Sequence, residues 1–310
     1  MPAPRFQHRW GRHILLFLLT VGTTTALGIQ HYVNFASDFA TRNPIPDFVD
    51  RYRASEAIWW VLKAYGGQGL LYSAAILGIL GAHEMGHYLM CRRYNVDATL
   101  PFFLPFPSLA GTIGAVIRVR EAFPTRTALF DMAVWGPLAG FIVTVPLLFW
   151  GMHLSRVVPM PADMHGGYLL GEPLLFQLAR WWTFGPIPAG SDINMHPVVF
   201  AAWIGMLATA WNLLPFGQMD GGHLTYATLG DVSREISLAT AGFCIGMCFV
   251  SLSWGLMTLV MLIMLRFFGA RHPPVLNEYE PLGRGRYALA IFAFVMLIVC
   301  FTPAPANVIP

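Results

Sequence analysis

The residues best suited to chemistry form the pattern His83-Glu84-Met85-Gly86-His87. On a helix, the two histidines of this pattern lie one turn apart on the same face. Two imidazoles at that spacing can bind one zinc ion at about 2.0–2.1 Å, and the glutamate between them can act on a water bound to that metal. A chain of this composition would contain the pattern by chance about 0.007 times. The alternative, two structural histidines in a helix bundle, leaves the carboxylate of Glu84 unexplained.

A third metal ligand is expected because catalytic zinc usually has three protein ligands and one open position. Apart from Glu84, two acidic residues adjoin apolar stretches, Asp131 and Asp220. Asp131 has an ordinary explanation as a carboxylate near a helix start. Asp220 follows Pro215 and Gly217, which interrupt an apolar segment, and irregular backbone at membrane depth is tolerated only inside protein or beside a cavity. We therefore expect Asp220 to be the ligand, the alternative being a simple turn at the membrane surface.

The composition indicates that these residues lie in a membrane protein. The chain has 310 residues, of which 56% are hydrophobic and 11% charged, whereas an average soluble domain is about 25% charged. A soluble enzyme, a disordered protein and a nucleic-acid-binding domain are all poor interpretations, despite the net charge of +3. The four cysteines are too few for a disulfide framework.

Long stretches without Asp, Glu, Lys or Arg predict the membrane spans, because about 20 apolar residues cross the hydrocarbon core. They are His13–Ser37, Ala64–His83, Met132–Ser155, Ile193–Met219, Ile236–Leu265 and Tyr287–Pro310. The second continues past Glu84 to about Cys91, so the metal pattern lies inside the membrane part. The first is interpreted as a retained signal-anchor helix, with a cleaved signal peptide as the alternative.

The stretch 236–265 is long enough for two short helices that meet near Ser253-Trp254-Gly255. Counting basic residues decides between one crossing and two. With two crossings, 13 of the 19 lysines and arginines fall on the cytoplasmic side, and with one crossing only 9 do. We therefore predict an all-α polytopic membrane protein with about seven transmembrane helices, six being the alternative. We expect a multi-pass protein of a bacterial inner membrane, with its N-terminus in the cytoplasm.

The segments between the spans predict smaller elements. Residues 101–126 begin with a proline-rich stretch and continue with the alternating sequence Thr112–Arg120, which is typical of a strand. We expect a small membrane-associated β-hairpin on the cytoplasmic side. Residues 54–64 and 171–185 contain paired tryptophans and predict interfacial helices. The whole chain, 1–310, is expected to form one membrane-embedded domain with a catalytic core at about 68–222 and C-terminal transmembrane helices at 236–310.

Together, these motifs resemble the site-2 protease family of intramembrane zinc metalloproteases, peptidase family M50. The resemblance rests on His83-Glu84-x-x-His87 and on Asn212-x-x-Pro215-x4-Asp220-Gly221, and it runs from about Leu70 to Gly222. The later His272-Pro273-Pro274 segment resembles a bacterial and plastid branch, and the loops are too short for a PDZ or CBS domain. The common leucine before the aspartate is Met219 here, a volume-conserving change.

The resemblance implies one Zn²⁺ per chain held by His83, His87 and Asp220, with Glu84 as the catalytic base and Asn212 near the substrate. The reaction would be hydrolysis of a peptide bond in a membrane-spanning substrate protein within the lipid bilayer, with no nucleic acid involved. One alternative is a zinc transporter, which would need polar ligands along a pathway through the spans. The other alternative is an inactive homologue that only binds membrane helices. The presence of the glutamate Glu84 makes this alternative less favoured.

Overall fold

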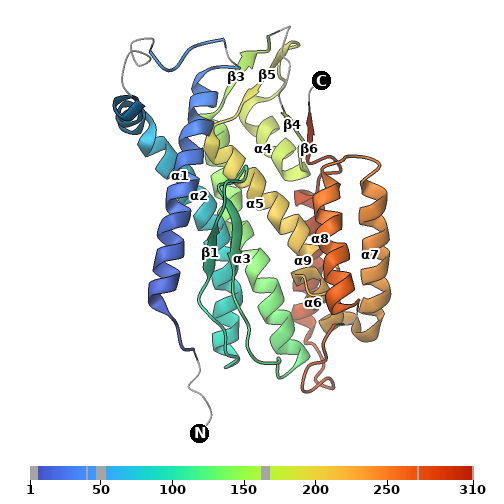
Figure 1. Ribbon diagram of the computed structural model, residues 1–310. Helices are drawn as coiled ribbons and strands as arrows, with labels where there is room; N and C mark the ends of the chain where they lie inside the picture. Colours follow the sequence, from blue (N-terminus) through green and yellow to red (C-terminus); the bar gives the residue numbers. More distant parts are fainter. Residues whose placement is uncertain (1–5, 40, 47–53, 162–167, 271, 309–310) are drawn as a thin grey trace.

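The computed structural model describes residues 6–39, 41–46, 54–161, 168–270 and 272–308 and is mostly helical (Figure 1). The long helices run roughly along one axis in alternating directions, and α1 begins and α9 ends at opposite ends of the molecule. The helices are α1 (Trp10–Ala36), α2 (Ala54–Arg93), α3 (Arg126–Leu154), α4 (Leu174–Phe184), α5 (Pro197–Leu213), α6 (Asp220–Leu229), α7 (Ser233–Met247), α8 (Trp254–Phe268) and α9 (Arg284–Cys300).

The apolar stretches of the sequence fold into helices of unequal length. Among the described residues, α1 and α3 are long and apolar enough to cross a membrane, and α5 and α8 are shorter apolar helices. The stretch 236–265 divides into α7 and α8, joined by a turn over 248–253. This break confirms the predicted division, while the number of crossings stays a prediction. Within the last apolar stretch, 287–310, α9 ends at Cys300 and the strand β6 (Ala306–Val308) follows.

One end of the bundle carries nine arginines in or next to the ends of its helices, and we call it the arginine-rich end. These residues belong to α1, α2, α3, α7, α8 and α9, and they are Arg9, Arg12, Arg92, Arg93, Arg126, Arg234, Arg266, Arg284 and Arg286. In Figure 1 this is the lower end of the molecule.

The interfacial helices are only partly as predicted. Residues 54–64 do not form a separate helix but are the first part of α2, which continues for 40 residues without a break. No proline interrupts this segment, so each backbone group can continue the helical hydrogen bonds. The predicted helix within 171–185 is confirmed as α4, and its Trp181 and Trp182 are 64% and 70% exposed.

The predicted hairpin consists of β1 (Phe102–Pro105) and β2 (Thr112–Val116), paired antiparallel with Phe102 opposite Val116. The hairpin was expected at the arginine-rich surface. It runs along α1 instead. The His13 ring contacts the Pro101 carbonyl oxygen at 3.1 Å, and the His31 ring contacts the Leu109 carbonyl oxygen at 3.2 Å. Eighteen residues of helix separate these two histidines, about 27 Å. The hairpin therefore extends deep into the bundle, where its polar backbone needs surrounding protein.

Two further small sheets lie at the end opposite the arginine-rich end (Figure 1). They pair β3 (Arg156–Pro159) with β5 (Ser191–Asn194), and β4 (Tyr168–Leu170) with β6 (Ala306–Val308). These strands were not predicted, because three or four residues are too few to show a periodic pattern.

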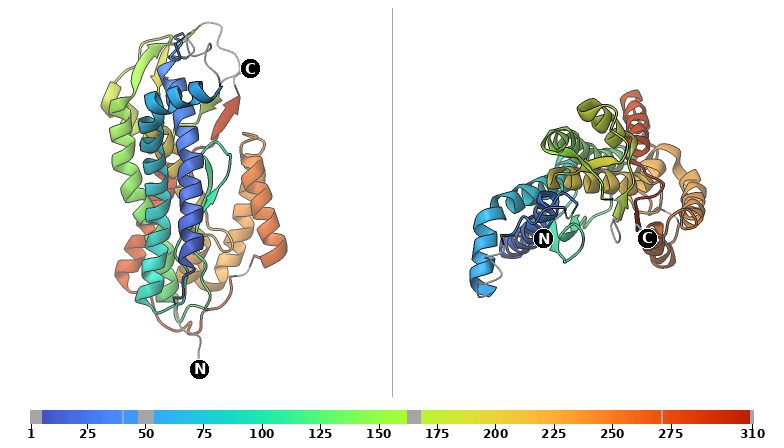
Figure 2. Two further views of the ribbon diagram at one scale, coloured as in Figure 1. Left: turned by 60° about the vertical axis from the view of Figure 1, so that its left-hand side comes forward. Right: turned by 90° about the horizontal axis from the view of Figure 1, so that it is seen from above.

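The metal pattern lies where α2 crosses α3, and α3 and α5 also contact each other. Glycine makes the close approach possible on both helices. A Cβ on Gly86 would overlap the Trp135 carbonyl oxygen, and a Cβ on Gly136 would overlap the ring of His87. Small residues at a helix crossing in a membrane allow this contact between backbones. The two turned views in Figure 2 show α1, α2 and α3 packed side by side.

Candidate metal centre

Helix α2 presents His83 and His87 on one face, as their spacing predicts. Both side chains are buried, with 7% and 5% of their surface exposed. Their Nε2 atoms point toward each other and are 3.0 Å apart. Two buried ring nitrogens at this distance form a natural pair of metal ligands.

The orientation of the His87 ring is fixed by helix α3. Its Nδ1 atom lies 2.8 Å from the carbonyl oxygen of Met132. A carbonyl oxygen only accepts hydrogen bonds, so Nδ1 must carry the proton and Nε2 keeps its lone pair. Metal-binding histidines are commonly held by a second hydrogen bond of this kind. No sequence pattern indicates this contact, since the partner is a backbone carbonyl.

Asp220 reaches the same point from the break between α5 and α6. Its Oδ2 atom is 3.3 Å from Nε2 of His83 and 3.4 Å from Nε2 of His87. The break follows α5 at Leu214 and includes Gly217, whose φ of +49° suits glycine. As predicted, the interruption of the helix delivers the carboxylate, and α6 starts at Asp220.

Helix α7 stabilises this irregular segment by bonding to its backbone. The Ser237 hydroxyl accepts a hydrogen bond from the Gly217 N–H at 3.1 Å, and the Thr240 hydroxyl donates one to the Pro215 carbonyl at 3.2 Å. Buried backbone groups outside regular structure need such partners. The two small polar residues of α7 therefore help to hold the aspartate in place.

The geometry of the three ligand atoms fits a small metal ion. The three atoms are separated by 3.0, 3.3 and 3.4 Å. Tetrahedral ligands about 2.0–2.1 Å from zinc lie roughly 3.3 Å from one another. The set of two imidazoles and one carboxylate is also typical of catalytic zinc sites, which leave a fourth position open. These residues therefore fit a zinc ion in ligand type and in spacing.

Glu84 lies beside this centre and is held by the hairpin segment. Its Oε2 atom accepts a hydrogen bond of 2.8 Å from the backbone N–H of Ile117. Arg118, the next residue, bonds through its N–H and its carbonyl to Thr99, on the side of β1. Because successive residues of an extended chain point their backbone groups to opposite sides, the N–H of Ile117 faces away from β1. Glu84 thus lies at the edge of the hairpin that β1 does not cover.

Asn212 also lies at the centre. Its Nδ2 atom is 3.4 Å from Nε2 of His83, and it comes from the last turn of α5. The amide is therefore close enough to reach a group bound in the open position.

Asp131 is not part of the metal centre. Its carboxylate forms an ion pair with Arg286 of α9, with a distance of 2.7 Å to Nε and 2.8 Å to Nη2, and accepts a hydrogen bond from Tyr94. It lies in the second turn of α3 rather than at its start. Arg126, five residues earlier in the sequence, lies 3.9 Å from Glu278 instead. The charge partner of Asp131 thus comes from a distant part of the sequence, which no local pattern could indicate.

The segment after α8 approaches the centre from the arginine-rich end. Its His272 contacts His223 at 2.5 Å between ring nitrogens and stacks on the Tyr226 ring. His223 is three residues after Asp220, so this contact lies next to the third ligand. The segment continues to Asn277, whose N–H donates to the Pro124 carbonyl at 2.9 Å.

Comparison with known proteins provides a further finding. A family model described as Peptidase family M50 matches residues 71–253, which include all the residues of the centre. The chain is similar to a probable zinc metalloprotease of chloroplasts, EGY1, from Arabidopsis thaliana, with 28% identity over 97% of this chain and 54% of the relative. It is also similar to the corresponding EGY2 of Oryza sativa subsp. indica, with 31% identity over 78% of this chain and 44% of the relative.

The chain spans about half the length of these curated relatives. No solved structure matches it significantly.

Proposed function

Since the chain belongs to peptidase family M50, we propose that it is an intramembrane zinc metalloprotease that hydrolyses peptide bonds of membrane-spanning substrate proteins. The observation that carries this proposal is the convergence of His83, His87 and Asp220 at ligand spacing, with Glu84 next to them on α2. The names of the relatives agree with zinc as the metal. We assign one Zn²⁺ per chain to these three ligands.

A zinc ion held there would supply a Lewis acid and lower the pKa of a bound water. Glu84 acts as the general base, taking a proton from the attacking water and returning it to the leaving amine. The Ile117 N–H donates a hydrogen bond that orients the carboxylate of Glu84. The amide of Asn212 donates a hydrogen bond to the substrate carbonyl oxygen, where negative charge develops.

The uncovered edge of the hairpin is the proposed place for the substrate backbone. A transmembrane helix hides its amides in internal hydrogen bonds, so it must unwind before cleavage. Within the described residues, β2 pairs with β1 alone. An extended substrate segment can add to the other edge and satisfy its backbone groups there. That edge also faces Glu84, so the bound segment would lie beside the catalytic base.

For the membrane topology, we propose seven crossings, α1, α2, α3, α5, α7, α8 and α9. The alternating directions of these helices support this arrangement. The arginine-rich end would face the cytoplasm, because basic residues concentrate on that side. We propose a bacterial inner membrane as the compartment, with the N-terminus cytoplasmic.

Cleavage of a single-span substrate tests the proposed activity. The purified protein is reconstituted in liposomes with a substrate labelled at both ends, and fragments are measured with and without a zinc chelator. We expect cleavage by the wild-type protein, loss of cleavage with the chelator and recovery after zinc is added. Substrate that stays intact with zinc-loaded protein, together with zinc transport into the liposomes, would instead favour a transporter.

A further inference from the structure

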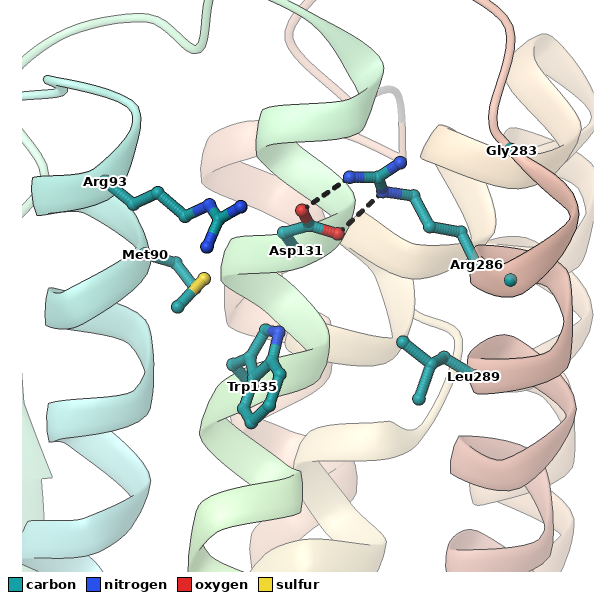
Figure 3. Close-up of a pocket in the computed structure, with 8 residues that line it drawn as sticks. Met90, Arg93, Asp131, Trp135, Gly283, Arg286 and Leu289 are labelled. Carbon is teal, nitrogen blue, oxygen red and sulfur yellow. Dashed lines mark hydrogen bonds and ion pairs between the residues drawn. The ribbon is translucent and has the colours of Figure 1, made fainter.

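A cavity of about 300 Å³ lies outside the metal centre, at the arginine-rich end (Figure 3). It is bounded by the end of α2, the first turns of α3 and the start of α9. Helices α2 and α9 both contact α3, which forms the back of the cavity. The α9 wall is open because Gly283 and Gly285 bring no side chains, and a Cβ on Gly285 would meet nothing within 4 Å.

The lining of this cavity has two levels. The charged residues Arg93, Asp131 and Arg286 lie at the level nearer the arginine-rich end. Each helix then provides an apolar residue about one turn deeper, namely Met90 on α2, Trp135 on α3 and Leu289 on α9. One helical turn is about 5.4 Å. The cavity therefore changes from charged to apolar over the depth at which a phospholipid changes from headgroup to acyl chain.

The charged level has an excess of positive charge. The carboxylate of Asp131 already accepts hydrogen bonds from Arg286 and Tyr94. Arg286 uses its Nε and Nη2 atoms in these contacts, so Nη1 has no partner among the described residues. The guanidinium group of Arg93 points into the cavity, and no hydrogen bond or ion pair joins it to any described residue. Two guanidinium groups against one carboxylate leave donors for an anion.

We propose that this cavity binds an anionic phospholipid of the leaflet at the arginine-rich end. The phosphate group would accept hydrogen bonds from Arg93 and from Nη1 of Arg286, while one acyl chain would pack along Trp135 and Leu289. Trp135 is 39% exposed, and tryptophan favours the membrane interface. Basic pockets between transmembrane helices suit such headgroups. The proposal depends on the membrane placement given above but not on proteolysis.

Native mass spectrometry of the purified protein tests this site. The protein is mixed with equal amounts of phosphatidylglycerol and phosphatidylcholine, and the ratio of the two bound lipids is measured. We expect the wild-type protein to prefer phosphatidylglycerol. Arg93→Gln should reduce this preference about fivefold, as expected for one arginine near an anionic surface. Gly285→Leu, which adds bulk to the cavity wall and keeps every charge, should also reduce bound phosphatidylglycerol.

Arg234→Gln is the matched control. Arg234 lies at the same end but outside the cavity and near Glu235, so its loss should change the ratio less than twofold. Zinc content and substrate cleavage, measured on the same samples, separate failure of the lipid site from failure of the proposed protease. Equal effects of Arg93→Gln and Arg234→Gln would overturn the proposal, as would a wild-type protein without lipid preference. Displacement of the lipid by soluble glycerol phosphate would overturn it too, since the acyl chain would then contribute nothing.

Discussion

At the scale of single residues, each group around the metal centre has a distinct geometric task. In the proposed centre, His83 and His87 would supply ring nitrogens and Asp220 the third ligand atom, and Glu84 follows His83 on α2. The sequence predicted these four residues because helical spacing and a broken helix leave clear patterns. It could not predict the two backbone partners, the Met132 carbonyl and the Ile117 N–H. Backbone groups are the same at every residue, so only the fold identifies them.

Replacement of the proposed base gives the first prediction. Glu84→Gln keeps the shape of the side chain but cannot take a proton from water. We expect cleavage to fall by roughly 10²–10⁴-fold, the usual contribution of a general base, with unchanged zinc content. Rates are measured on the reconstituted protein with a single-span substrate. Cleavage at the wild-type rate would remove Glu84 from the mechanism.

At the scale of elements, the crossing of α2 and α3 determines where the His87 ring lies. Gly136 and Gly140 of α3 make the close packing of the two helices possible. A Cβ on Gly136 would overlap the ring of His87, and a Cβ on Gly140 would lie 3.2 Å from Cβ of His83. The depth of the hairpin was not predictable in this way, because it depends on hydrogen bonds from α1 that join residues about 80 positions apart.

The second prediction tests this crossing. Gly136→Ala should displace the His87 ring or separate the helices, and overpacking of this kind costs about 1–3 kcal/mol. We expect weaker zinc binding and a lower unfolding temperature. The control is Gly78→Ala on the facing helix α2, where a Cβ meets nothing within 4 Å. If both variants bind zinc as the wild-type protein does, the close approach is not needed for the centre.

The hairpin gives the third prediction. Ile117→Pro removes the N–H that bonds to Glu84, whereas Ile117→Ala keeps it. We expect the proline variant to cleave at least about tenfold more slowly, since a misplaced base loses much of its contribution, and the alanine variant to stay within about threefold of wild type. Zinc content should stay normal in both. Equal cleavage by the two variants would mean that the hairpin is scaffold only.

At the scale of the whole molecule, the sequence predicted a membrane protein built mainly of helices, and the structure agrees in its helical content. Charge-free stretches mark helices reliably, because the membrane excludes charge from their middle parts. They mark helix ends poorly, as α9 shows by ending at Cys300 and leaving the rest of the stretch to β6. Short strands and contacts between distant segments, such as Arg286 with Asp131, leave no comparable signal.

The topology gives the fourth prediction. In a background without the four native cysteines, Gly285→Cys should react with a membrane-impermeant thiol reagent only after the cells are opened. The reason is that position 285 lies at the arginine-rich end, which we assign to the cytoplasm. Labelling is detected on the purified protein. Reaction in intact cells would place this end outside and would contradict the proposed orientation.

The central claim is that His83, His87 and Asp220 hold one zinc ion, and the zinc content of purified protein tests it most directly. Zinc per chain is measured by elemental mass spectrometry for the wild-type protein, Asp220→Asn and the control Asp231→Asn. Asp231 is an exposed aspartate of the 3₁₀ turn that follows α6. We expect about one zinc ion per chain in the wild-type protein and the control, and loss of most of it in Asp220→Asn, because removal of a ligand weakens the site. Full zinc in a folded Asp220→Asn variant would contradict the account.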